Sequence, residues 1–214
     1  AGIQSELHWE DHNANLNDLE KLVQKLEDQP VDLIILPEMF TTGFTMNAVQ
    51  CAEKTEGRSL EWMREQSSRL NAAITGSIFV EEHGLYYNRL YFVGPDGGYK
   101  TYDKRHAFSY AGEDKVFEKG TKRLIVEYKG WKICPLICYD LRFPVWSRNT
   151  EEFDVLIYVA NWPESRIQAW DALLKARAIE NLCYTIGVNR IGKDGNQIHY
   201  NGHSSIHDPL GQRI

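Results

Sequence analysis

The spacing of apolar residues along the chain predicts a regular succession of helices and strands. Residues 15–28 carry leucine and valine at intervals of three and four, which is the spacing of one face of a helix. The continuous apolar run Val31–Leu36 instead has the length and composition of a buried strand, and Pro37 ends it. Glu38 therefore follows at the carboxyl end of a predicted strand.

The alternation continues to the end of the sequence and indicates an α/β protein. Residues 103–122 have no period and are predicted to form a long loop, which in a compact protein is often functional. Catalytic groups in α/β folds gather at the carboxyl ends of strands, where Glu38 and Cys138 both lie in this pattern. Helices are also expected over 59–70 and 165–181, and strands over 72–80, 87–93, 99–102, 124–128, 131–137, 155–159, 184–189 and 202–207.

Length and composition indicate one globular domain over residues 1–214. The chain is 43% hydrophobic and 25% charged, and a chain of 214 residues buries most of its apolar surface in a single core. The net charge is −6 without a Lys/Arg-rich run, which argues against a nucleic-acid partner. No segment reaches the roughly 20 apolar residues of a membrane span, so no membrane partner is expected.

The four cysteines, at 51, 134, 138 and 183, do not have the spacing of a disulfide framework. Cys134 and Cys138 lie on one predicted strand, where four residues span roughly 13 Å. That separation is too large for a disulfide. We therefore expect reduced thiols and a cytoplasmic location.

Three residues are candidates for covalent catalysis. Cys138 stands where an apolar strand enters a polar turn, so its thiol can face a substrate; a buried structural thiol is the alternative. A carboxylate at Glu38 would have low-dielectric surroundings, which suits a general base, unless it caps the next turn. The ammonium of Lys104 would stabilise an oxyanion, although a solvated surface lysine is the commoner case.

The histidines offer weaker alternatives. His106 would be the partner of the cysteine in a papain-like hydrolase. His203 and His207 are four residues apart, but the residues between them favour a strand, on which the rings stand too far apart for one metal ion. The sequence has no CxxC or HExxH pattern and no phosphate-binding glycine loop, so we expect neither a metal nor an organic cofactor.

The candidates occur in order within segments that resemble the nitrilase (carbon-nitrogen hydrolase) superfamily, and the resemblance covers essentially the whole chain. It implies a four-layer αββα sandwich and a Glu-Lys-Cys triad at Glu38, Lys104 and Cys138. The segments that carry it are Leu36–Phe40, Tyr102–His106, Leu136–Pro144, Val159–Pro163, Arg177–Asn181, Gly202–Ser204 and Asp208–Gly211.

The resemblance also implies features around this triad. A second glutamate is expected near the site, and Glu113 fits that position better than Glu118. The backbone N–H of Tyr139 would assist Lys104 as an oxyanion donor. Members of the family commonly pair through surfaces near the cysteine, so a homodimer is expected.

Within the superfamily, Tyr139-Asp140 after the cysteine is similar to amidases, whereas true nitrilases usually carry Trp-Glu there. Residues 39–44 and 158–163 are most similar to the omega-amidase branch. The resemblance implies a thiol-dependent amidohydrolase that releases ammonia, through a cysteine thioester, from a dicarboxylic acid monoamide such as 2-oxoglutaramate. A hydrolase of N-carbamoyl amino acids, aliphatic amides or nitriles is one alternative. An inactive binding scaffold is another, and the intact triad argues against it.

Two further residues and the end of the chain leave alternatives open. Arg142 either binds a substrate carboxylate or forms a structural ion pair near Asp140, and the ion pair is the favoured interpretation. Trp162 lines the pocket or packs in the core. Chains of the family continue for some tens of residues past Asp208–Gly211, whereas this sequence ends at Ile214, so we expect its C-terminal end to be incomplete.

Overall fold

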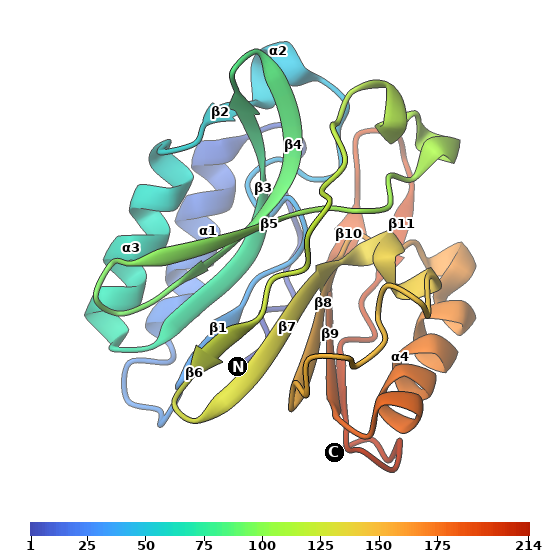
Figure 1. Ribbon diagram of the computed structural model, residues 1–214. Helices are drawn as coiled ribbons and strands as arrows, with labels where there is room; N and C mark the ends of the chain where they lie inside the picture. Colours follow the sequence, from blue (N-terminus) through green and yellow to red (C-terminus); the bar gives the residue numbers. More distant parts are fainter.

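The computed structural model describes residues 1–214, which form two β-sheets enclosed between layers of helices (Figure 1). Helices α1 (His12–Gln24) and α3 (Arg58–Leu70) cover the outer face of the first sheet, and α4 (Ile167–Asn181) covers the outer face of the second. The layers therefore follow the order helix, sheet, sheet, helix. This arrangement confirms the predicted αββα sandwich.

The first sheet contains a long antiparallel hairpin, β3–β4, whose strands correspond to the strands predicted over 72–80 and 87–93. The strand order is β1-β3-β4-β5, with β1 parallel to β3 and the short β2 paired to the far end of β3. The strands are β1 (Leu33–Ile35), β2 (Glu53–Lys54), β3 (Ala73–Glu82), β4 (Leu85–Val93) and β5 (Tyr99–Asp103), with the one-turn helix α2 (Ala48–Cys51) before β2.

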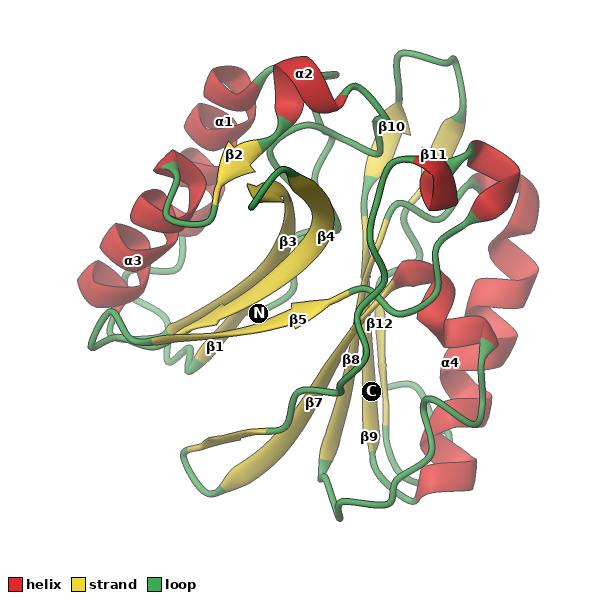
Figure 2. Cartoon of the chain, turned by 45° about the horizontal axis from the view of Figure 1, so that its top comes forward, coloured by secondary structure: helices red, strands yellow, loops and turns green.

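The second sheet has the order β12-β9-β8-β7-β6, and β7, β8 and β9 run parallel. A separate hairpin, β10–β11, extends beyond this sheet and was not predicted (Figure 2). The strands are β6 (Val126–Tyr128), β7 (Trp131–Ile137), β8 (Val155–Ala160), β9 (Tyr184–Asn189), β10 (Ile191–Lys193), β11 (His199–Asn201) and β12 (Ser205–His207).

The main apolar core fills the space between the sheets and continues beneath α4. Leu90 from the first sheet and Leu136 from the second belong to the same fully buried cluster. Each such side chain stabilises the fold by about 1.5–3 kcal/mol. On the outer face a Cβ at Gly187 would lie 2.5 Å from Leu174 of α4, so this helix packs directly on β9. The two sheets thus form a rigid frame for residues at their ends.

Two predicted segments differ in detail from the structure. The helix expected over 15–28 is α1, which begins at His12 because the side chain of Asp11 accepts the N–H of Ala14 at 3.0 Å. The predicted loop 103–122 contains two 3-10 turns, η1 (Ser109–Ala111) and η2 (Glu113–Lys115), which are too short to produce a period. None of the helices is long and apolar enough to cross a membrane.

Candidate active site

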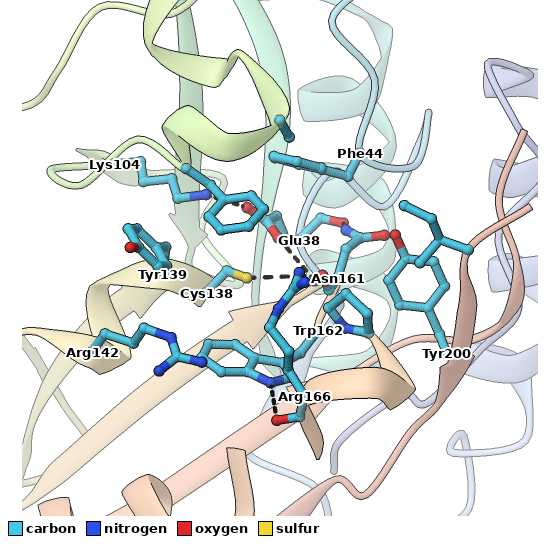
Figure 3. A pocket seen from close by; sticks show the side chains of 14 residues that line it. Glu38, Phe44, Lys104, Cys138, Tyr139, Arg142, Asn161, Trp162, Arg166 and Tyr200 are labelled. Carbon is cyan, nitrogen blue, oxygen red and sulfur yellow. Dashed lines mark hydrogen bonds and ion pairs between the residues drawn. The ribbon is translucent and has the colours of Figure 1, made fainter. Parts of the chain in front are cut away.

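The three predicted catalytic residues meet at one end of the two facing sheets. Glu38 follows β1, Lys104 follows β5 and Cys138 follows β7, so each lies just past the carboxyl end of its strand. All three line the same cavity (Figure 3). The structure therefore brings together residues that are far apart in the sequence, as predicted.

Lys104 lies between two buried carboxylates. Its Nζ donates to Oε1 of Glu38 at 2.8 Å and to Oε1 and Oε2 of Glu113 at 2.9 and 3.0 Å. Lys104 is only 3% exposed and both carboxylates are fully buried, so water contributes little to their solvation. Glu113 is thus the second glutamate near the site, whereas Glu118 is exposed.

Burial and charge act in opposite directions on this cluster. Burial lowers the pKa of Lys104, but the charges of Glu113 and Glu38 outweigh burial and hold this pKa above its ordinary value. Burial raises the pKa of Glu113, and the charge of Lys104 opposes that rise. The lysine therefore remains an ammonium group at neutral pH.

Two asparagines that were not assigned a role complete the network. Asn88 on β4 donates from Nδ2 to Glu38 at 2.9 Å and to Glu113 at 3.2 Å. Asn161 donates its backbone N–H to Oε2 of Glu38 at 2.9 Å and its Nδ2 to the Glu38 carbonyl at 2.6 Å. Both oxygens of the Glu38 carboxylate are consequently fixed. Asn88 could have been noticed in the sequence as a polar residue within a largely apolar strand.

Cys138 is the first residue of a 3-10 turn, η3 (Cys138–Arg142), and its φ of 44° lies in the left-handed region. Such a conformation costs about 1–3 kcal/mol in a residue other than glycine. The carboxylate of Asp140 supports the turn, because it accepts the Ile137 N–H at 3.1 Å and the Tyr102 hydroxyl at 2.6 Å. The corner after β7 is therefore a firmly held position for the sulfur atom.

The surroundings of Cys138 favour its neutral thiol form. Burial and the charge of Glu38 raise its pKa well above the ordinary value, although Lys104 acts in the opposite direction. Tyr139 comes next in η3, where the N–H groups of the first turn have no partner within the helix. A hydrogen-bond donor is thus available beside the sulfur atom.

The cavity around Cys138 has mainly apolar walls. Its free volume is about 60 Å³, which is small beside the roughly 300–1,000 Å³ of sites for drug-sized ligands. Phe44, Phe108, Trp162, Ile198 and Tyr200 form most of its sides. A small ligand with a short carbon chain fits such a space.

The whole chain, residues 1–214, matches the carbon-nitrogen hydrolase family. The protein belongs to this family. Omega-amidase YafV of Yersinia enterocolitica is 47% identical over 98% of this chain and 81% of its own length. A 2-oxoglutaramate amidase of Bacillus subtilis is 33% identical over 98% of this chain and 82% of its own.

A solved structure agrees with this membership. A carbon-nitrogen hydrolase superfamily protein of Xanthomonas campestris, determined with an arsenic adduct in its active site, superposes with a TM-score of 0.96 at 46% identity. The alignment covers 99% of this chain and 82% of the Xanthomonas protein. The family match and the omega-amidase relatives confirm the predicted superfamily and its omega-amidase branch.

In this carbon-nitrogen hydrolase the expected ion pair between Arg142 and Asp140 does not form. Asp140 is already occupied by Tyr102, His106 and the backbone of Ile137. The guanidinium of Arg142 instead lies over the Trp162 ring, 5.0 Å from its centroid, and lines the cavity. The favoured interpretation was therefore wrong, and Arg142 is free to meet a ligand.

Trp162 satisfies both of its predicted interpretations. It is 3% exposed, and its ring lies 5.4 Å from that of Trp170 in the core of the carbon-nitrogen hydrolase fold. Another edge of the residue lines the cavity. It therefore connects the pocket wall to the core.

The histidines do not pair with Cys138. The Nδ1 of His106 lies 2.8 Å from Asp140, and its ring stacks on Phe143 at 3.6 Å, outside the cavity lining. His203 contacts Asp171 and His207 contacts Ser205. No group of three or more metal-ligating side chains is assembled, and all four cysteines are free.

Proposed function

We propose that this carbon-nitrogen hydrolase is an omega-amidase, which removes the terminal amide of a small dicarboxylic acid monoamide such as 2-oxoglutaramate. The observation that carries the proposal is the buried Glu38–Lys104–Glu113 cluster beside Cys138, against an apolar cavity. The relatives support the substrate class, since they include an omega-amidase and a 2-oxoglutaramate amidase.

The reaction begins with removal of a proton from a neutral thiol. Because the pKa of Cys138 is raised, a base must act during attack, and Glu38 is the carboxylate whose charge acts most strongly on the sulfur. The sulfur then attacks the amide carbonyl, and the proton passes to Glu38. Asn161 and Lys104 hold this carboxylate in one orientation throughout.

Charge that develops on the carbonyl oxygen is stabilised by Lys104 and the N–H of Tyr139. Removal of one such donor typically costs roughly 3–4 kcal/mol in the transition state. Glu113 keeps the ammonium group in position through two hydrogen bonds. It acts through Lys104 and is a positioning residue.

The tetrahedral intermediate collapses when the C–N bond breaks and Glu38 returns its proton to the leaving ammonia. The acyl group remains on Cys138 as a thioester. Water, deprotonated by Glu38, hydrolyses the thioester and releases the carboxylic acid product. The thiol regains its proton, so the cycle is balanced without a cofactor.

The substrate's chain lies between the apolar walls, with Arg142 and Trp162 as binding residues. Arg142 forms no ion pair and supplies positive charge at the edge of the cavity. A substrate with an amide at one end and a carboxylate at the other complements this distribution of charge.

The homodimer and the cytoplasmic location remain part of the proposal. Exposed apolar side chains at the C-terminal end of α4 and on the segments after η3 and β12 would serve such a pairing: Val145, Ile179, Leu182 and Leu210. The four free cysteines fit a reducing compartment.

A substrate panel tests the proposed activity. Ammonia release is compared for 2-oxoglutaramate, an N-carbamoyl amino acid, an aliphatic amide and an aliphatic nitrile at equal concentrations. The highest kcat/KM is expected for 2-oxoglutaramate. A higher value for the carbamoyl compound or the nitrile would replace the substrate assignment.

A further inference from the structure

Arg166 is a cation that lines the cavity without an ionic partner. It lies at the end of the 3-10 turn η4 (Glu164–Arg166), directly before α4. The buried Arg89 pairs with Asp103 at 2.6 Å, whereas the guanidinium of the partly exposed Arg166 forms no ion pair. Because no carboxylate of the protein neutralises it, this guanidinium is available to an anionic ligand in the cavity.

The side chain is nevertheless held in place. Its guanidinium carbon lies 5.0 Å from the centroid of the Phe108 ring, and its backbone carbonyl accepts the indole N–H of Trp162 at 2.9 Å. Stacking on the ring face leaves the N–H donors along the edge of the guanidinium available. Figure 3 shows this side chain reaching from η4 toward the centre of the pocket, while Arg142 lies at its edge.

Charge is separated along the cavity. Cys138 and Glu38 line the cavity beside the buried acidic cluster, while Arg142 and Arg166 also line an adjoining open depression and so stand where the cavity meets that depression. Glu164 is the acidic residue on that depression and forms no ion pair with either arginine.

We propose that Arg166 binds the carboxylate of the substrate and thereby selects anionic amides over neutral ones, an assignment that rests on the function proposed above. Its planar group offers two parallel N–H donors to a carboxylate, which fixes the far end of the chain. The reactive amide is then directed to Cys138. Arg166 is thus a specificity-determining residue in addition to Arg142.

The kinetic test compares Arg166→Gln and Arg166→Lys with the parent on 2-oxoglutaramate and on neutral propionamide. Arg166→Gln is expected to raise KM for 2-oxoglutaramate about 10- to 100-fold, the loss typical of a charged hydrogen bond, with a smaller change in kcat. Propionamide turnover should stay within about twofold, since that amide has no carboxylate. Arg166→Lys should restore part of the loss, because it keeps the charge without the planar fork.

Lys175→Gln is the matched control, because it removes one positive charge from the exposed face of α4, outside the cavity lining. It should leave both substrates unaffected. An equal loss on both amides in Arg166→Gln, or an unchanged KM for 2-oxoglutaramate, would overturn the assignment.

A second measurement separates this assignment from the proposed activity. Protection of Cys138 from iodoacetamide by 2-oxoglutarate reports binding of the dicarboxylate without turnover. Arg166→Gln should need about 10- to 100-fold more 2-oxoglutarate for equal protection. A parent that is protected in this way but releases no ammonia contradicts the omega-amidase function alone. Equal protection of parent and variant overturns the role of Arg166 alone.

Discussion

In the proposed mechanism, Cys138 and Glu38 divide the first chemical step between them. The burial that raises the pKa of the thiol also keeps it unreactive until a base removes its proton. Its left-handed backbone conformation, supported by Asp140, fixes the direction of attack. Reactivity at this residue therefore depends on its neighbours more than on the thiol itself.

Glu38→Gln should lower kcat by roughly 10²- to 10⁴-fold, the usual contribution of a general base.

Without the base, alkylation of Cys138 by iodoacetamide depends on the thiolate fraction. Because burial keeps the thiol pKa raised, that rate should climb with pH up to and beyond about pH 9. A stopped assay over this pH range measures the rate at which iodoacetamide alkylates Cys138 in Glu38→Gln. An alkylation rate that is constant from about pH 6 upward would indicate a preformed thiolate instead.

Lys104→Met should destabilise the protein by about 3–5 kcal/mol at neutral pH, because it leaves two buried carboxylates without their cation. The pKa of Glu113 is already raised by burial, and loss of Lys104 removes the charge that opposes the rise. The folded state then holds a proton that the unfolded chain has released. Stability is therefore greatest below the unfolded pKa and falls as pH rises through the folded one.

Urea unfolding of Lys104→Met and the parent at about pH 5 and about pH 7.5 measures this effect. The difference in the free energy of unfolding between the parent and Lys104→Met should be larger at about pH 7.5 than at about pH 5. An equal difference in unfolding free energy at both pH values would show that the pKa of Glu113 does not depend on Lys104.

The loop between β5 and β6 positions Lys104 through its backbone. The N–H of Gly120 donates to the Lys104 carbonyl at 3.0 Å, and a Cβ at Gly120 would lie 1.9 Å from the carbonyl oxygen of Asp103. Backbone cannot move aside as a flexible side chain does. Gly120→Ala should cost at least about 1–3 kcal/mol of stability and also lower kcat, since the ammonium shifts.

Thermal unfolding and ammonia release measure both effects in Gly120→Ala. Gly98→Ala is the control, because the added Cβ would contact mainly the end of the Asp96 side chain, at 3.2 Å. If Gly120→Ala behaved like this control, the loop would not determine the position of Lys104.

His106 supports the turn η3 through its contact with Asp140 and is not the catalytic partner of Cys138 in this account. His106→Ala removes the contact with Asp140, so a stability loss of about 1–3 kcal/mol is expected. Much of the turnover should survive, because the ring lies outside the cavity lining. Steady-state kinetics at saturating amide checks this, and an activity as low as that of Cys138→Ala would restore the Cys/His alternative.

Strands and helices with a strong apolar period could be predicted from sequence. The run Val31–Leu36 predicted β1 and the position of Glu38 after it, because a continuous apolar run indicates a buried strand without knowledge of the strands that pair with it. The hairpin β10–β11 was missed, since its strands are only three residues long. The turns η1 and η2 were missed for the same reason.

At the scale of the whole molecule, the proposed catalytic residues could be predicted from the sequence, but their surroundings could not. The order of Glu38, Lys104 and Cys138 within distinctive segments predicted the triad, and the structure brings the three side chains to one cavity. Asn88 and Arg166 gave no comparable signal, because their roles depend on two sheets and a turn that meet only in three dimensions. Arg142 was misjudged because the other partners of Asp140 come from distant strands.

The most direct test of the account is ammonia release from 2-oxoglutaramate by the parent and by Cys138→Ala. Circular dichroism first establishes that both proteins are folded. The account predicts rapid release by the parent and a loss of at least roughly 10³-fold in the variant, because the covalent route is removed. No release by the folded parent, or full release by the variant, would contradict it.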